Sequence, residues 1–258
     1  MNQSLIIIPD IHLAHEQAEG ILARYRGSTA LFLGDYFDDW GDSATAHRHT
    51  ASWLLWSTQQ SGRIHLLGNH DPYYFTGQPC CEVPGGTRQK LMAGAEFLTK
   101  KAWEQMKTHY WITANFLATH AGLTRSQAHP IRPLDEFMSQ QEKEFKEACL
   151  HNLDHPWLRW GRRAGLAESA GPIWCDWRDF QLIPGLHQIF GHSPLTNKPQ
   201  WLCRDGTVNV MLDGPVQPKG GAKYPGGYGV YADGRLTIFT KNHRWIKSLK
   251  ITPPAVSL

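Results

Sequence analysis

The chain has 258 residues, of which 41% are hydrophobic and 19% are charged, and its formal net charge is +3 at pH 7. This length and composition predict a globular protein with a sizeable core, and the weak charge gives no indication of a nucleic-acid partner. No segment has the pattern of a signal peptide or the length of a transmembrane helix, and the five cysteines show no C-x-x-C spacing, so we expect a soluble, reduced, cytoplasmic protein with no membrane partner.

The first third of the sequence alternates strand-like and helix-like segments. Apolar runs predict strands at 5–8, 30–33 and 64–67, and helical spacing predicts helices at 15–25 and 44–59. This order predicts a β-α-β-α-β unit with parallel strands.

The middle of the chain is more varied. A loop rich in Gly and Pro is expected at 72–86, a helix at 90–107 and a pair of strands at 110–119. An amphipathic helix is predicted at 134–153, and we interpret 124–170 as a helical insertion that covers a site within a single domain, 1–258. Trp157 and Trp160 of this insertion are candidates for a hydrophobic wall beside the substrate.

The last part predicts short strands at 188–190, 208–212, 227–231 and 236–240. The basic segment at 241–250 is expected to be a surface strand or tail rather than a nucleic-acid patch.

Five short polar motifs follow apolar runs, at the points where the predicted strands end. They are Pro9-Asp10-Ile11-His12, Gly34-Asp35-Tyr36-Phe37-Asp38, Gly68-Asn69-His70-Asp71, Thr119-His120-Ala121-Gly122 and Phe190-Gly191-His192. Ligand sites of α/β proteins collect at the carboxyl ends of strands. Five such motifs in order indicate a metal centre.

A site for two metal ions needs a carboxylate that can bridge them, together with terminal oxygen and nitrogen ligands. Asp35 is the best candidate for the bridge because it directly follows a buried strand. Asp10 and His12 can turn toward one ion, and Asn69, His120 and His192 can complete the other. Asp, His and Asn ligands suit Mn, Fe, Zn, Co or Ni, and manganese is our first expectation.

Together the motifs resemble the calcineurin-like metallophosphoesterases. They are most similar to the phosphoprotein phosphatase branch, which includes diadenosine tetraphosphate hydrolases. The branch resemblance rests on the second Asp, Asp38, on the Thr-His-Ala-Gly segment at 119–122, and on Gly191-His192-Ser193-Pro194, where many relatives have Gly-His-x-His. The segments at 173–176 and 208–213 are also similar to this branch.

The resemblance implies a fold, a site and a mechanism. The fold is a four-layer α/β/β/α sandwich with two mixed sheets and a dinuclear metal site at the sheet edge. Asp10, His12 and Asp35 would hold one divalent ion, and Asp35, Asn69, His120 and His192 the other. A hydroxide activated by the metals would attack the phosphate ester. His70, oriented by Asp38, would be the acid that protonates the leaving group.

One position departs from the pattern of the branch. Asp39 stands where the branch has an Arg that grips the substrate phosphate. Arg178 is the leading substitute and would bind substrate together with Asn69; Arg159, Arg162 and Arg163 are further candidates.

Three functions remain open. The first is a phosphomonoesterase that acts on a phosphoprotein or a small phosphometabolite. The second is a phosphodiesterase or dinucleoside polyphosphate hydrolase, because such substrates carry less charge per phosphorus. The third, a non-catalytic metal-binding scaffold, is disfavoured because every expected ligand position is filled.

Overall fold

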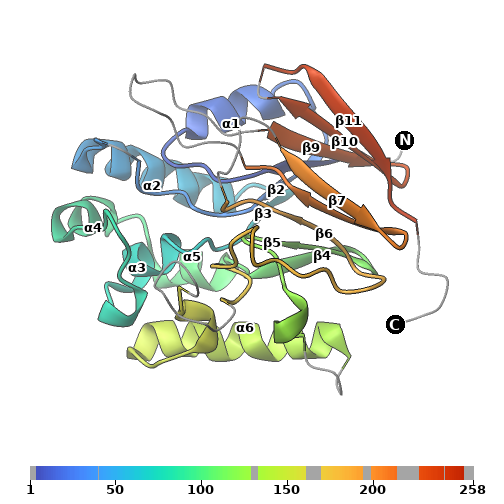
Figure 1. Ribbon diagram of the computed structural model, residues 1–258. Coiled ribbons are helices and arrows are strands. Elements are labelled where there is room, and N and C mark those ends of the chain that lie inside the picture. Colours follow the sequence, from blue (N-terminus) through green and yellow to red (C-terminus); the bar gives the residue numbers. More distant parts are fainter. Residues whose placement is uncertain are drawn as a thin grey trace.

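The computed structural model describes residues 4–39, 41–128, 133–160, 170–193, 199–213, 227–240 and 242–252. Two β-sheets pack face to face, and helices cover their outer faces (Figure 1). The larger sheet has the strand order β11-β10-β9-β1-β2-β3, and the smaller sheet has the order β4-β5-β6-β8-β7. The strands of the larger sheet are β1 (Leu5–Ile8), β2 (Thr29–Phe32), β3 (Arg63–His65), β9 (Gly227–Ala232), β10 (Arg235–Thr240) and β11 (Trp245–Lys250). Those of the smaller sheet are β4 (His109–Thr113), β5 (Phe116–Thr119), β6 (His187–Phe190), β7 (Gln200–Arg204) and β8 (Thr207–Met211).

Both sheets are mixed. In the larger sheet, β1, β2 and β3 pair in parallel, whereas β9, β10 and β11 join as antiparallel strands. In the smaller sheet, β5, β6 and β8 are parallel, and β4 and β7 pair with its two sides in antiparallel fashion. The predicted β-α-β-α-β unit is therefore confirmed by β1, β2 and β3 and by the helices α1 (His15–Leu22) and α2 (Ala44–Thr58) between them.

Side chains of β1 alternate between two cores. Ile6 and Ile8 belong to the cluster that includes Ile21 of α1 and Leu54 of α2. Leu5 and Ile7 point the other way and join residues of the smaller sheet, such as Ile189. Because successive side chains of a strand face opposite sides, one strand can serve both the helical layer and the inter-sheet layer. The four-layer α/β/β/α fold is confirmed.

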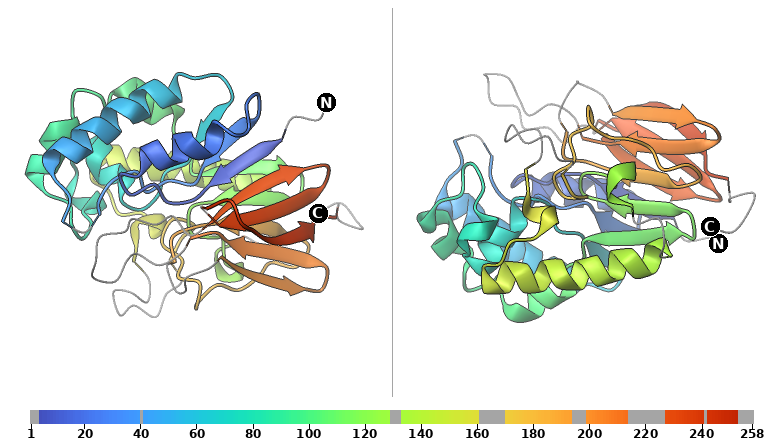
Figure 2. Two further views of the ribbon diagram at one scale, coloured as in Figure 1. Left: turned by 90° about the horizontal axis from the view of Figure 1, so that it is seen from above. Right: turned by 60° about the horizontal axis from the view of Figure 1, so that its bottom comes forward.

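The fourth layer is the long helix α6 (Leu134–His151). Its buried side chains, Met138, Phe145 and Cys149, lie in the same cluster as Leu117 of β5. Figures 1 and 2 show α6 running along the outer side of the smaller sheet, next to β4 and β5. The predicted helix at 134–153 is therefore present and well packed. Residues 161–169 of the expected insertion lie outside the described residues, and the insertion itself stays a prediction.

The predicted loop at 72–86 is wrong in part, because it contains the helix α3 (Asp71–Thr76) and the 3-10 turn η1 (Pro79–Cys81). Pro72 lies in the first turn of α3, where its missing N–H is not needed, and Gly77 ends the helix with a φ of 66°. Pro and Gly therefore mark the start and the end of a short helix here rather than a continuous loop.

The single helix predicted at 90–107 is two helices, α4 (Arg88–Gly94) and α5 (Lys100–Gln105). Each begins at a Thr whose hydroxyl accepts a backbone N–H, Thr87 for α4 and Thr99 for α5. Gly94, at the end of α4, packs so tightly on α2 that a Cβ there would lie 3.1 Å from the Cβ of Ala51. The second Thr cap redirects the chain.

Strand β7 was not predicted, because Trp201, Leu202, Cys203 and Arg204 are all exposed and the strand has no buried face to create a period-two pattern. The basic C-terminal segment forms the surface strand β11.

Two further 3-10 turns are η2 (Arg125–Gln127) and η3 (Pro156–Leu158). Within the described ranges, no helix combines the length and the apolar character that crossing a membrane requires.

Candidate metal centre and acid–base pair

The five polar motifs meet at one edge of the two sheets. Asp10 and His12 follow β1, Asp35 and Asp38 follow β2, and Asn69 and His70 follow β3. His120 follows β5 and His192 follows β6 in the smaller sheet. These strands run parallel within each sheet, so their carboxyl ends lie on the same side.

Two groups of candidate metal ligands share Asp35. One consists of Asp10, His12 and Asp35, and the other of Asp35, His120 and His192. Asp35 Oδ2 lies 3.8 Å from His12 Nε2 and 3.4 Å from His120 Nε2. The same carboxylate oxygen therefore lies between the two groups.

Asn69 joins the second group. Its Oδ1 lies 3.0 Å from His120 Nε2, and His192 Nδ1 lies 3.1 Å from the same nitrogen. Both residues are at most 4% exposed. The structure thus brings all six residues proposed as metal ligands into one cluster.

Backbone carbonyl groups orient the imidazole rings of His12 and His120. His12 Nδ1 donates to the carbonyl oxygen of Asp38 at 2.6 Å, and His120 Nδ1 donates to the carbonyl oxygen of Leu33 at 2.9 Å. With a proton held at Nδ1, Nε2 of each ring faces the carboxylate of Asp35 and is the nitrogen left to bind a metal ion. This is the arrangement by which backbone groups fix the tautomer of metal-binding histidines.

Glycines allow the motif loops to approach one another. A Cβ at Gly68 would lie 2.1 Å from Asp35 Oδ1, and one at Gly191 would lie 2.1 Å from Asp10 Oδ1. Asp35 and His192 themselves have positive φ angles, 48° and 71°. The loops therefore adopt conformations that are costly for most residues in order to converge on this point.

The electrostatics of the cluster favour bound cations. Burial alone would lower the pKa of His12 and His120, but the carboxylates of Asp35 and Asp10 raise both pKa values to about 9. Burial and the neighbouring Asp35 raise the pKa of Asp10 above its ordinary value. The buried carboxylates of Asp10 and Asp35 thus favour the protonated, positively charged forms of the His12 and His120 rings. The mixed oxygen and nitrogen donor set fits divalent transition metals, which would bind in competition with those protons.

Beside this cluster, His70 pairs with Asp38. His70 Nδ1 lies 2.8 Å from Asp38 Oδ2, and the backbone N–H of His70 donates to Asp35 Oδ1 at 2.9 Å. The rings of His70 and His12 lie edge to face with centroids 5.8 Å apart. The expected acid and its carboxylate partner are therefore adjacent to the candidate metal ligands.

Asp38 has further partners. Tyr74 donates to its Oδ1 at 2.5 Å, and Lys90 Nζ lies 3.2 Å from the same oxygen. Burial favours the neutral acid, but the hydrogen bonds from His70, Tyr74 and Lys90 hold the pKa of Asp38 below its ordinary value. Asp38 is thus a carboxylate with a fixed orientation.

Asp71 ties two of the motif loops together. Its fully buried carboxylate accepts the backbone N–H groups of Asp35 at 2.9 Å, Tyr36 at 2.8 Å and Gly68 at 2.7 Å. Burial and the charge of Asp35 raise the pKa of Asp71 to about 7. These contacts make Asp71 a side chain that stabilises the turns around the candidate ligands.

Sequence reasoning did not find Lys90, Asp42 or His47. Lys90 Nζ lies 2.6 Å from Asp42 Oδ1, and His47 Nε2 lies 2.6 Å from Asp42 Oδ2. Asp38, Asp42 and His47 form a third group with metal-ligand spacing, but the ammonium of Lys90 already supplies its positive charge. The sequence offers no periodic or motif signal for these contacts, because Lys90 and Asp38 are 52 positions apart.

Asp213, at the end of β8, is a further charged neighbour. Its carboxylate contributes to the raised pKa of His12. Asp213 lies in a segment that resembled the phosphatase branch, and this resemblance was the available signal.

Arg178 pairs with Asp176 in a bidentate fashion, with Nε 2.9 Å from Oδ1 and Nη2 2.8 Å from Oδ2. The adjacent Trp177 N–H donates to Ser193 Oγ at 2.9 Å, which links this segment to the residue after His192. Asp39, at the place of the branch Arg, donates its backbone N–H to Asp42 Oδ2 at 3.2 Å. A substrate-binding role for Arg178 stays a prediction; among the alternatives, Arg159 pairs with Asp154, and Arg162 and Arg163 lie outside the described residues.

The two tryptophans proposed as a substrate wall differ. Trp157 is 1% exposed and packs on Phe145, so it belongs to the core. Trp160 is half-buried, stacks on Trp174 and lines an open pocket.

Comparisons with known proteins agree with this site. A model of the calcineurin-like phosphoesterase family matches residues 4–195. The fold is similar to that of a cold-active protein-tyrosine phosphatase from a psychrophilic Shewanella species, with 14% sequence identity, a TM-score of 0.61, and coverage of 98% of this chain and 81% of that one. It is also similar to a protein serine/threonine phosphatase from Saccharomyces cerevisiae, with 12% identity, a TM-score of 0.54, and coverage of 99% of this chain and 82% of that one. A search of curated proteins finds no match.

The chain belongs to the calcineurin-like phosphoesterase family, whose model spans all five motifs. It is accordingly a hydrolase of phosphoric esters with candidate groups for divalent metal ions. The structural likenesses, at identities of 14% and 12%, show the fold alone.

Proposed function

We propose that this chain hydrolyses phosphomonoesters, carried by a phosphoprotein or a small phosphometabolite, at a centre of two divalent metal ions. The observation that carries the proposal is the position of the His70–Asp38 pair. The backbone N–H of His70 donates to Asp35, which is also a candidate metal ligand. The centroid of the His70 ring lies 5.8 Å from that of the His12 ring. A general acid is thus held one side chain away from the groups that would bind the phosphate.

Asp10, His12 and Asp35 would hold one ion, and Asp35, Asn69, His120 and His192 the other, so that Asp35 belongs to both groups. Two divalent ions in such a site polarise a phosphoryl oxygen and lower the pKa of water to near neutrality. Manganese is the first expectation among the metals that suit these donors.

The chain's own residues supply the proton. Asp38 Oδ2 accepts a hydrogen bond from the Nδ1–H group of His70. Nε2 of His70 is then the nitrogen that carries the proton given to the leaving-group oxygen. Tyr74 and Lys90 hold Asp38 in place, and Asp38 in turn holds the ring of His70. Arg178 and the neutral amide of Asn69 are the proposed contacts to the phosphate oxygens.

The choice of monoesters rests on two supports. The resemblance of the motifs to the phosphoprotein phosphatase branch favours them. The two similar structures are named as protein phosphatases, which act on monoesters of Tyr or of Ser and Thr.

A second candidate function is hydrolysis of diesters or dinucleoside polyphosphates. It is favoured by Asp39, which puts a carboxylate where the branch has a phosphate-binding Arg. A like charge there weakens the binding of a dianionic monoester more than that of a monoanionic diester.

The two functions are separated by measuring turnover of para-nitrophenyl phosphate and bis-para-nitrophenyl phosphate by metal-stripped protein resupplied with Mn²⁺. We expect the monoester to be preferred, and its turnover to be lost in Asp35→Asn, lowered in His70→Ala and unchanged in His49→Ala, which alters an exposed histidine. A preference for the diester would favour the second function. Metal binding without turnover of either substrate would contradict both hydrolase functions and would favour a non-catalytic metal-binding scaffold.

A further inference from the structure

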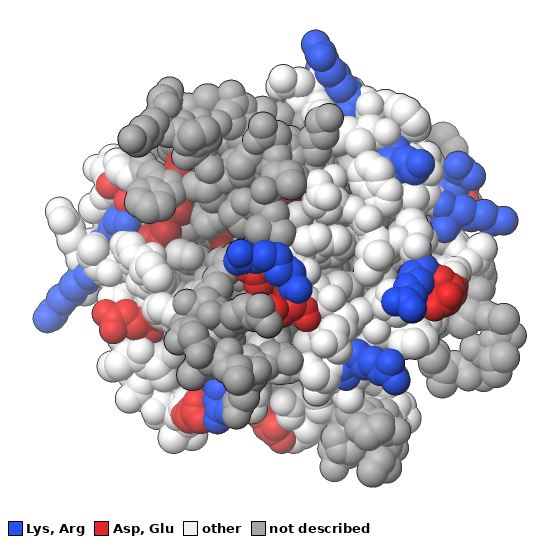
Figure 3. Space-filling view, viewed as in Figure 1, with Lys and Arg blue, Asp and Glu red and all other residues white. Residues whose placement is uncertain are grey.

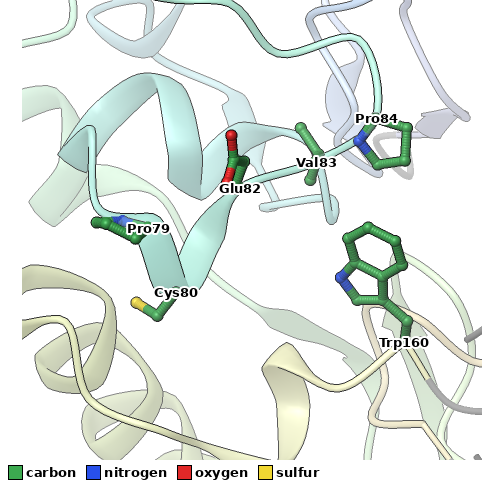
Figure 4. Close-up of a pocket in the computed structure, with 6 residues that line it drawn as sticks. All are labelled: Pro79, Cys80, Glu82, Val83, Pro84 and Trp160. Carbon is green, nitrogen blue, oxygen red and sulfur yellow. The ribbon is translucent and has the colours of Figure 1, made fainter.

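An open pocket lies between the segment that follows α3 and the residue Trp160. It encloses about 410 Å³ and is lined by Pro79, Cys80, Glu82, Val83, Pro84 and Trp160. Figure 4 shows the indole of Trp160 across from Val83 and Pro84, with Pro79 and Cys80 to one side. Pockets that bind small molecules have volumes of roughly 300–1,000 Å³, so this one is large enough for a ring system.

One wall of the pocket continues to the acid–base pair. Pro84 is followed by Gly85, where a Cβ would lie 3.6 Å from Asp38 Oδ1. The carbonyl oxygen of Gly85 accepts a hydrogen bond from Lys90 at 2.8 Å, and Lys90 also contacts Asp38. The pocket therefore adjoins the carboxylate that orients His70.

The opposite wall continues to the candidate metal ligands. Trp160 stacks on Trp174 with ring centroids 5.2 Å apart, and Trp174 meets His192 edge to face at 5.7 Å. The pocket is thus connected to the acid on one side and to the ligand cluster on the other.

This placement assigns the pocket to one end of the substrate. The acid gives its proton to the oxygen of the leaving group, so the remainder of the leaving group extends past the His70–Asp38 pair rather than into the ligand cluster. The wall formed by Val83 and Pro84 begins directly beside that pair.

The lining defines the chemistry of the occupant. Pro79, Val83, Pro84 and Trp160 offer apolar surface, and the indole of Trp160 is the aromatic ring among them. Glu82 is exposed at this pocket, and its carboxylate repels a second anionic group. Building on the phosphoesterase function proposed above, we infer that the pocket between Trp160 and Pro84 binds the leaving group of the substrate and selects a neutral, flat aromatic one.

The test compares two substrates that differ in the ring but not in the chemistry of the broken bond. 2-Phenylethyl phosphate and butyl phosphate both release a primary alcohol. We expect wild-type protein to favour the aromatic ester in kcat/KM by about tenfold, the size of effect that one aromatic stacking contact gives. Trp160→Ala should lower kcat/KM for 2-phenylethyl phosphate more than for butyl phosphate and so remove this preference, whereas Trp160→Phe should keep part of it.

Pro84→Ala provides a second variant at the exposed wall and should reduce the preference in the same direction. Trp245→Ala is the matched control, because Trp245 is 64% exposed and lies on β11. Equal kcat/KM for the two esters in wild-type protein would overturn the inference. A loss of both activities alike in Trp160→Ala and in Pro84→Ala would overturn it too.

A binding measurement separates this inference from the proposed function. 2-Phenylethylphosphonate and butylphosphonate cannot be hydrolysed, and their binding to the metal-loaded protein is measured by calorimetry. Tighter binding of the aromatic phosphonate that is lost in Trp160→Ala supports the pocket even if no ester is turned over, in which case only the proposed function fails. Equal binding of the two phosphonates contradicts the pocket, whatever the turnover.

Discussion

His70 Nδ1 and Asp38 Oδ2 lie 2.8 Å apart, although the two residues are 32 positions apart in the chain. Asp38 is fixed by hydrogen bonds from Tyr74 and Lys90 as well, so His70 is held against a carboxylate that cannot turn away. The pair belongs to two different strand ends, and the parallel pairing of β2 with β3 brings those ends together.

If His70 protonates the leaving group, its removal should matter most when the leaving group is poor. We expect His70→Ala to lower kcat by about 10²–10⁴-fold for phenyl phosphate and far less for 2,4-dinitrophenyl phosphate, whose phenolate leaves without protonation. Asp38→Asn should show the same pattern with a smaller loss, because the ring is still present but less well oriented. An equal loss on both substrates would show that His70 acts in another way.

Lys90 should act through Asp38 rather than through the substrate. Its ammonium contacts Asp42, Asp38 and the carbonyl oxygen of Gly85, at 2.6, 3.2 and 2.8 Å. We expect Lys90→Met to lower kcat by about tenfold with little change in KM, since it removes a positioning contact made equally with and without substrate. Lys101→Met, at an exposed position of α5, is the control. A raised KM with unchanged kcat would instead place Lys90 on the phosphate.

Asp35 should control metal binding more than any other single ligand, because its Oδ2 lies between both groups. Metal-stripped wild-type protein should gain several degrees in Tm when Mn²⁺ is added, since a ligand that binds only the folded state stabilises it. Asp35→Asn should lose most of this gain and retain less metal by elemental analysis. Asp205→Asn, at an exposed turn, should behave as wild type. An unchanged metal content in Asp35→Asn would contradict the shared-ligand assignment.

The docking of α6 should depend on pH through Glu142. Burial would raise the pKa of this carboxyl, but hydrogen bonds from His109 and Thr108 at the start of β4 lower it from 4.5 to about 2. A carboxyl whose pKa is lower in the folded state stabilises the fold above its unfolded pKa, and this contribution is lost as the pH falls from 4.5 toward 2.

Glu142→Gln should therefore lower the free energy of unfolding by about 1 kcal/mol at pH 7, a figure reduced for partial solvent screening. The difference from wild type should shrink at pH 3. Urea unfolding at the two pH values measures both, with Glu147→Gln on the exposed face of α6 as the control. A difference that is the same at pH 3 and pH 7 would show that the charge of Glu142 does not contribute.

The elements that could be predicted from the sequence are those whose buried side chains form an apolar run or a helical repeat. The strands β1, β2 and β3 appear as apolar runs, and α1, α2 and α6 each carry a buried stripe. The helix α3 was missed because six residues are too few to show a period, and β7 was missed because neither of its faces is buried. The second sheet was expected from the family resemblance rather than from the pattern of residues.

The site could be predicted in outline for a related reason. Asp10, Asp35, His120 and their partners each stand directly after a strand, where position along the chain predicts position in space. Lys90, Asp42 and His47 stand on or beside helices, and only the packing of α4 against α2 brings them to Asp38. No pattern within either helix contains that information.

The positive φ angles at the site have a consequence for how this protein can change. His12, Asp35, Asp38 and His192 hold φ values of 38°, 48°, 62° and 71°, a region that glycine adopts without cost and other residues at roughly 1 kcal/mol or more. Glycine at any of the four would relax the backbone while deleting a proposed ligand or the partner of the acid. In the metal-free protein, a search for stabilising substitutions should therefore find glycine at these positions without any assay of activity.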